Sequence, residues 1–188
     1  MSNLLEPVDA LRRINAWVAL NHPNRLPFVR MGARSDTIQR FERRLGRKLP
    51  PCLRQLYAAH DGQPEGAISL LLNQRWLPLD LVVVAWEDLC FRYGCNEDGA
   101  SDDDARCLAT LVWSATWLPL FGSPRGDHYC VELSADRPDR HGRIIWFLYD
   151  EPDRPVVAPS ISELLSRIAR GLDTGRWQLD EVYDGLCD

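Results

Sequence analysis

The segment HYCVELSADRPDRHGRIIWFLY, His128 to Tyr149, decides the fold class of this chain. Residues 128–133 alternate between polar and apolar side chains, as in a strand with one buried face. Arg143 to Tyr149 is almost continuously apolar and rich in β-branched and aromatic residues, which is typical of a central strand. The polar segment between them contains Pro138 and Gly142 and predicts a turn, so we expect the two strands to pair antiparallel.

Strands and helices are predicted on both sides of this hairpin. Three further segments favour strands: Ala67–Leu72, Trp117–Leu120 and Val156–Ala158. Helical spacing of apolar residues recurs in five segments: 4–20, 35–45, Pro51 to His60, 81–93 and 161–170. Ser35 and Ser160 are expected to cap two of these helices, and Gly171 to close the last.

This order of elements predicts an α+β fold. Helices come first, then mostly strands, then one more helix, which is typical of helices packed against an antiparallel sheet. We therefore expect a single domain with a mainly antiparallel sheet, helices packed on one face and a C-terminal helix.

The composition is that of a folded globular protein. With 188 residues, 45% of them hydrophobic, the chain can bury a substantial core. No apolar stretch approaches the roughly 18 residues of a membrane helix, and the N-terminus does not resemble a signal peptide. We therefore expect a cytoplasmic protein without membrane contact. The six cysteines lack zinc-ligand spacing, and a long chain without an export signal disfavours disulfides.

Charge is distributed unevenly along the chain. Residues 1–60 hold eleven Arg/Lys and four Asp/Glu, a net of +7, and the remaining residues have a net charge of −12. The basic part has few of the aromatic side chains that stack on bases, so nucleic acid is not expected as a partner. The acidic part would attract a basic protein.

Part of this acidity lies in the segment NEDGASDDDA, Asn96 to Ala105. The segment does not fit a calcium loop, because Gly99 at the sixth position would place Gly94 at the first. Its four aspartates are candidate partner-binding residues: Asp98, Asp102, Asp103 and Asp104. The alternative is a solvated loop that contacts no partner.

His60 and Asp61 suggest a catalytic pair, but the end of a helix explains them better. Gly62 fits the left-handed position that often follows a helix, and Asp61 can accept local backbone N–H groups. No Ser or Cys nucleophile accompanies the pair in a known motif.

Other catalytic signals are weak. The segment GSPRG at residues 122–126 lacks the Lys-Ser/Thr of a phosphate-binding loop and reads as a turn. Asp127 and His128 leave a hydrolase as a minor alternative. We predict that the chain is not an enzyme and has no cofactor and no metal site.

Four segments, in this order, resemble the SUKH superfamily: Arg30–Gln63, Trp117–Leu133, His141–Pro152 and Val156–Ile168. The superfamily includes fungal cell-wall assembly regulators and bacterial toxin-immunity proteins, and the chain is most similar to the regulator-type branch. Its motif residues here are Glu42, Leu49, Pro50, Asp61, Gly62, Trp117, Leu118, Pro119, Gly126 and Asp127. The resemblance covers about residues 28–172, and it implies one domain over residues 1–188 with an N-terminal helix and a short tail.

The resemblance implies binding rather than catalysis. Our first prediction is an immunity protein that binds and neutralises a cognate secreted toxin, from contact-dependent or type VI secretion. The alternative is a cell-wall-related regulatory or scaffold protein of the Smi/Knr type without a toxin partner. Either protein would act on a protein partner. We also expect Trp117 to be buried against the C-terminal helix, near Leu164 or Ile168.

Overall fold

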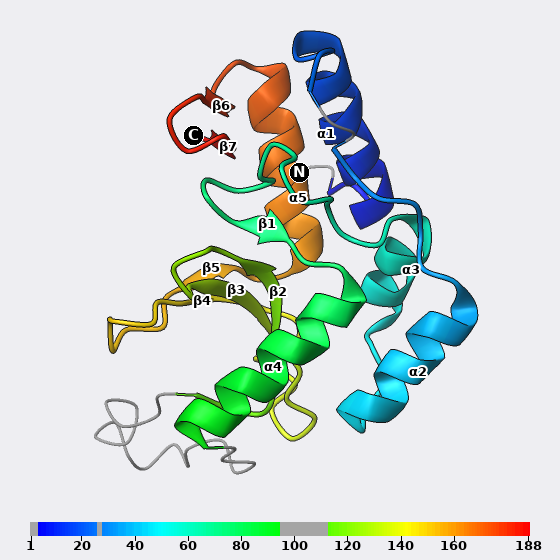
Figure 1. The fold of residues 1–188 in the computed structure, drawn as a ribbon, viewed down its shortest axis with the longest axis vertical. Helices are drawn as coiled ribbons and strands as arrows, with labels where there is room; N and C mark the ends of the chain where they lie inside the picture. The colour runs from blue at the N-terminus through cyan, green and yellow to red at the C-terminus, as the bar shows by residue number, and fades with distance from the viewer. Residues whose placement is uncertain (1–3, 26–27, 95–112) are drawn as a thin grey trace.

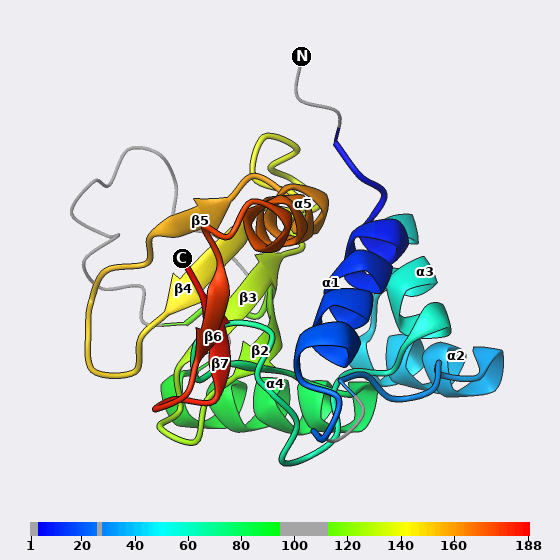
Figure 2. The same ribbon diagram turned by 90° about the horizontal axis from the view of Figure 1, so that it is seen from above.

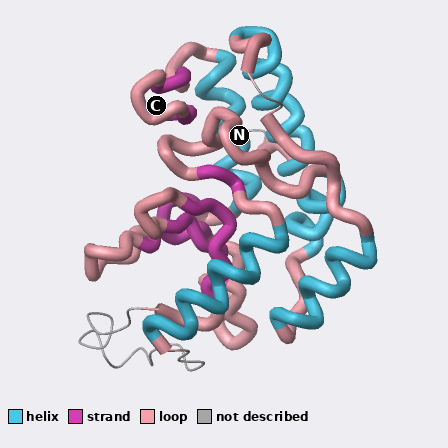
Figure 3. Tube along the Cα trace, in the orientation of Figure 1, coloured by secondary structure: helices cyan, strands magenta, loops and turns pink. Residues whose placement is uncertain are grey.

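The computed structural model describes residues 4–25, 28–94 and 113–188 (Figure 1). Within them the helices are α1 (Pro7–Asn21), α2 (Ser35–Leu45), α3 (Pro51–Ala59), α4 (Leu79–Tyr93) and α5 (Ile161–Asp173). The strands are β1 (Arg75–Trp76), β2 (Trp117–Gly122), β3 (His128–Glu132), β4 (Ile144–Phe147), β5 (Val156–Ala158), β6 (Gln178–Asp180) and β7 (Gly185–Cys187). Figure 3 shows the strands gathered on one side of the molecule and α1 to α3 on the other.

The main sheet is antiparallel, with the order β1-β2-β3-β4-β5. In the central hairpin Val131 faces Ile144 and Tyr129 faces Trp146. The predicted hairpin, the α+β class and the C-terminal helix are therefore confirmed. A second, two-stranded sheet of β6 and β7 near the C-terminus was not predicted.

Only some of the predicted helix ends are confirmed. The Ser160 hydroxyl accepts a hydrogen bond from the Glu163 N–H at 3.1 Å, which confirms the predicted cap of α5. The predicted cap at Ser35 is wrong, because Ser35 is the first helical residue and the preceding residue makes no side-chain cap bond. Gly171 does not end α5. A Cβ there would lie 2.0 Å from Cδ1 of Trp177, so the glycine makes room for that ring.

The predicted strand at Ala67–Leu72 is also wrong, since only isolated bridges occur there. Ser69 bridges to Gly185 of β7, and a buried side chain bonds much of the remaining backbone. The Gln63 amide oxygen accepts the N–H groups of Leu70 and Trp76 at 3.0 Å. Its amide nitrogen donates to the carbonyl oxygen of Ile68 at 2.7 Å. Gln63 thereby satisfies backbone groups that a neighbouring strand would otherwise bond.

Helices cover both faces of the sheet, so the prediction that they pack on one face is wrong. One face, with Leu118 and Ile144, packs in the main core with α1, α3 and α5. Figure 2 shows α1 beside α5, with α2 and α3 on the side of α1 away from the sheet. The other face packs Trp117 and Phe147 against Leu89 of α4. Trp117 is buried as expected, but its predicted neighbours on the terminal helix are wrong, because that helix packs on the opposite face.

No helix in the described parts of the chain is long and apolar enough to cross a membrane. The cytoplasmic location stays a prediction. In these parts Cys52, Cys130 and Cys187 form no disulfide.

Candidate functional site

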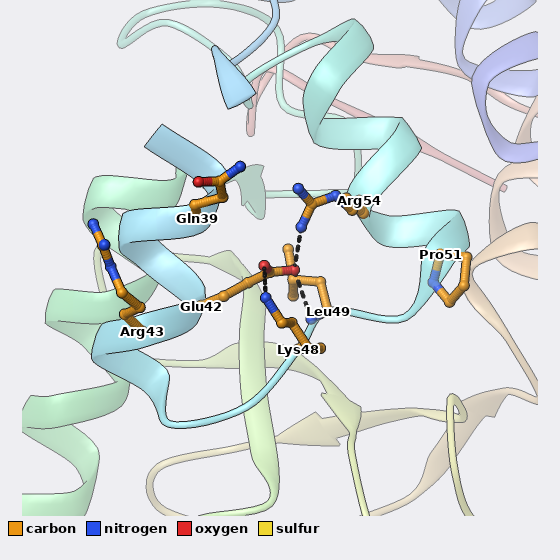
Figure 4. A pocket seen from close by; sticks show the side chains of 7 residues that line it. All are labelled: Gln39, Glu42, Arg43, Lys48, Leu49, Pro51 and Arg54. Atoms are coloured by element: carbon orange, nitrogen blue, oxygen red, sulfur yellow. Dashed lines mark hydrogen bonds and ion pairs between the residues drawn. The ribbon is translucent and has the colours of Figure 1, made fainter. Parts of the chain in front are cut away.

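Glu42 holds α2 against the start of α3. Its side chain is 2% exposed and accepts three hydrogen bonds, from Arg54 at 2.6 Å and from Lys48 and the Leu49 N–H at 3.2 Å (Figure 4). Burial raises the pKa of this carboxyl, but the bonds from Arg54, Lys48 and Leu49 outweigh burial and leave the pKa below its ordinary value. The charged Glu42 side chain therefore ties α2 to the loop at Leu49 and Pro50 that leads into α3. We call Glu42 with its three hydrogen bonds the clasp.

A pocket of about 400 Å³ lies above this clasp. We call it the α2–α3 pocket. Figure 4 shows the side chains that line it: Gln39, Glu42, Arg43, Lys48, Leu49, Pro51 and Arg54.

Asp61 and Gly62 link the end of α3 to the start of α4. Gly62 has φ +71°, as expected for a left-handed residue. The prediction that Asp61 bonds local backbone is wrong, because its carboxylate accepts the N–H of Leu79, the first residue of α4, at 3.0 Å. Burial raises the pKa of Asp61. His60 instead lies 3.3 Å from the carbonyl oxygen of Arg30, so the two side chains do not form a catalytic pair.

Asp127 and His128 do not form a catalytic pair either. Asp127 follows Gly126, which has φ +94°, and its carboxylate accepts the N–H of Tyr149 at 3.2 Å. His128 Nδ1 lies 3.1 Å from the carbonyl oxygen of Phe121. Burial lowers the pKa of His128, which favours its neutral form. Since each side chain bonds a different backbone group, the geometry gives no support to the hydrolase alternative.

The motif residues Trp117 and Pro119 are buried in β2. Together with Asp127 they belong to the framework rather than to an accessible site. The four candidate partner-binding aspartates, Asp98, Asp102, Asp103 and Asp104, lie outside the described residues. Among the residues that are described, no three His, Cys, Asp or Glu side chains come together as metal ligands.

A larger groove, of about 640 Å³, lies between α4, the β1–β2 end of the sheet and the segment joining β6 to β7. We call it the α4 groove. Its wall includes three apolar side chains that remain accessible: Leu81 at 39%, Val84 at 53% and Tyr183 at 52% exposure. Beyond the groove on the same helix, Phe91 is 90% exposed. Leu81 and Val84 are held there by α4, and Tyr183 by the turn between β6 and β7; exposed apolar side chains that line one groove mark a candidate protein-binding site.

The α4 groove also carries charge. Of the described residues that line it, three are acidic, Glu65, Asp88 and Asp184, and one is an arginine, Arg75. Asp88 pairs with Arg92 at 2.8 Å and Asp184 with Arg25 at 2.6 Å. Glu65 and Arg75 form no ion pair within the described residues and can meet charges on a partner.

Sequence reasoning missed this groove because one of its walls is the C-terminal segment that was read as a tail. The only available signals were the apolar positions Leu81 and Val84, one helical turn apart. A helix that buries its other face gives such positions no distinct pattern.

Comparisons with known proteins agree on one family. The model of the SMI1 / KNR4 family (SUKH-1) matches residues 32–167. The glucan synthesis regulatory protein of Neurospora crassa is 25% identical over 93% of this chain and 40% of the relative. The cell wall biosynthesis/cell cycle regulator smi1 of Schizosaccharomyces pombe is 23% identical over 98% of this chain and 40% of the relative. The cell wall assembly regulator SMI1 of Saccharomyces cerevisiae is 21% identical over 96% and 44%, respectively.

These relatives correct the functional prediction. They are named as regulators of glucan synthesis and the cell wall, which contradicts the toxin-immunity prediction and favours the regulatory alternative. The chain spans about 40% of the length of the curated relatives it matches.

Proposed function

Because the chain belongs to the SMI1/KNR4 (SUKH-1) family, we propose that it is a regulatory module that binds a protein partner and catalyses no reaction itself. Its relatives are named as regulators of glucan synthesis or the cell wall, and we extend that role to this chain. The extension is a proposal about one module, since each relative is more than twice as long as the part matched here.

The observation that carries the proposal is the α4 groove. Leu81 and Val84 stand on a helix whose other face is in the core, so they are fixed in position before a partner arrives. Binding to a preformed surface loses little conformational entropy. Covering half-exposed apolar side chains supplies favourable free energy, at about 25 cal/mol for each Å² removed from water.

The charges indicate which partner segment fits. Asp88 and Asp184 are already paired with Arg92 and Arg25, so Glu65 is the groove carboxylate that is left to meet a cation of the partner. A segment with apolar anchors for Leu81 and Val84 and a Lys or Arg facing Glu65 would match both features. Opposite charges at an interface raise the association rate and fix the register of the bound segment.

The function can be tested in yeast cells with a chimera. In the S. cerevisiae relative, the region that matches this chain is replaced by it, and cell-wall glucan is measured in a strain that lacks the natural protein. We expect the chimera to restore glucan content. Val84→Glu should abolish this rescue, because a charge would stand where an apolar anchor has to pack.

Leu20→Glu is the matched control for that variant. Leu20 is 80% exposed on α1 and does not line the α4 groove. It adds the same charge to the same kind of surface position, and rescue should persist. A folded chimera that restores no glucan would contradict the cell-wall role. Equal rescue by both variants would remove the groove from the function.

A further inference from the structure

The α2–α3 pocket gathers positive charge around a buried clasp. Three of its residues are basic, Arg43, Lys48 and Arg54, and among the described residues that line it the only acid is Glu42. The Lys48 side chain is 80% exposed and that of Arg54 is 36% exposed, while that of Glu42 is 2% exposed. The charged groups of Lys48 and Arg54 are therefore accessible to solvent, whereas the Glu42 carboxylate beneath them is buried.

Glu42 cannot neutralise the whole pocket. Its single charge is shared between Arg54 and Lys48, and Arg43 forms no ion pair within the described residues. A net charge of about +2 remains at the pocket mouth by simple count. Glu42 also fixes the Arg54 guanidinium through the 2.6 Å hydrogen bond. A guanidinium held in place gives up little side-chain entropy when it binds a second carboxylate.

The shape and the remaining lining favour a protein ligand. Leu49 and Pro51 add an apolar wall to a concave site, which suits one side chain of a folded or extended segment. None of the described residues that line this pocket is aromatic, so none can stack on a base as single-stranded nucleic acid would require.

We propose that the α2–α3 pocket is a second binding site, which takes an Asp- or Glu-bearing segment of a partner protein. The incoming carboxylate meets Lys48 and the free side of Arg54, Arg43 adds its charge from the edge of the pocket, and the adjoining residue rests on Leu49 and Pro51. The described residues that line this pocket and those that line the α4 groove are entirely different. The module would then hold a basic-apolar segment at one site and an acidic segment at the other, as a bivalent scaffold requires.

The test is direct binding with a defined probe. Fluorescence anisotropy measures the Kd of a labelled peptide of alternating Glu and Ala for the full chain, at low and at physiological salt. We expect saturable binding that weakens as salt rises, because exposed charges are screened. The double variant Arg43→Ala with Lys48→Ala should weaken binding by roughly 2- to 30-fold, the range for two exposed ion pairs. Arg54 is left intact, because its loss would strand the buried Glu42.

A matched variant controls for net charge. Arg12→Ala with Arg92→Ala also removes two exposed cations, each from an exposed ion pair outside the pocket. Its Kd should change less than twofold. Equal weakening by both double variants would overturn the proposal, as would tighter binding to a single-stranded oligonucleotide of equal charge or to phosphatidylserine vesicles. Since Val84→Glu leaves the pocket untouched, it should bind the acidic peptide normally, so failure of this site and of the groove are distinguishable.

Discussion

Replacing Gly62 with Ala tests how the end of α3 holds the start of α4. Gly62 has φ +71°, and a Cβ in this left-handed region costs about 1 kcal/mol. The new Cβ would also lie 2.4 Å from the backbone nitrogen of Pro78 and 2.7 Å from the carbonyl carbon of Leu77. Backbone atoms cannot rotate away as a flexible side chain can.

The segment that the Cβ meets is fixed from two sides. The Tyr57 hydroxyl donates to the carbonyl oxygen of Leu77 at 3.0 Å, and Asp61 accepts the Leu79 N–H at the same distance. Leu77 also donates to the Leu120 carbonyl oxygen at 2.9 Å. Forced overpacking costs about 1–3 kcal/mol, so we expect Gly62→Ala to lower the free energy of unfolding by about 2–4 kcal/mol.

Urea denaturation followed by tryptophan fluorescence measures this loss. Gly46→Ala is the control, because Gly46 has nearly the same φ, +73°, but the added Cβ would have no atom of the described residues within 4 Å. It should cost only about 1 kcal/mol. Equal losses at the two glycines would show that the close approach to Leu77 and Pro78 contributes nothing, and would refute the reasoning.

Two further predictions concern the core and the charged clasp. Trp117→Ala should lower the free energy of unfolding by about 3–5 kcal/mol, since Trp117 is 6% exposed and packs edge-on to Trp113. The same urea denaturation measures this loss, and an unchanged stability would mean that this cluster is not tightly packed. Glu42 has a folded-state pKa below 4.5, so the folded chain binds fewer protons than the unfolded chain. The stability that this group contributes is present above pH 4.5 and is lost as pH falls through the folded-state pKa. Glu42→Gln should therefore have a lower free energy of unfolding at neutral pH, and that free energy should fall less steeply than in the unmodified chain as the pH is lowered below 4.5. Urea denaturation at a series of pH values measures both, and an unchanged fall at acid pH would contradict this.

Local patterns predicted the parts of the fold that local forces determine. The hairpin of β3 and β4 follows from alternation, β-prone residues and a polar turn between them. The Ser160 cap and the positive φ of Gly62 likewise depend on a few neighbouring residues. These features need no knowledge of what packs against them.

The errors came from contacts between distant residues. The partner of Asp61 is Leu79, 18 residues later, and no local rule identifies it. The backbone around Ile68 and Leu70 bonds to Gln63, so an apolar run that reads as a strand forms only an isolated bridge, from Ser69 to Gly185 of β7. Trp117 was assigned to the wrong face because β2 is buried on both sides, and a strand without polar positions does not reveal which face meets which helix.

The candidate site was still harder to predict. The α4 groove needs α4, the edge of the main sheet and the C-terminal hairpin together, and that hairpin consists of two three-residue strands. The α2–α3 pocket was signalled only as a basic excess before residue 60. This excess of basic residues indicates a binding pocket only when the structure shows that Glu42 is buried beneath Lys48 and Arg54.

The most direct test of the central claim is site-specific photocrosslinking from the α4 groove. A photoreactive phenylalanine analogue replaces Val84 in the yeast chimera, and crosslinked adducts are identified by mass spectrometry. The account predicts one defined protein adduct that is lost with Leu81→Glu and is absent when the same analogue replaces Leu20. Identical adducts from Val84 and Leu20, or an adduct that survives Leu81→Glu, would contradict the claim that this module regulates by binding a protein in the groove.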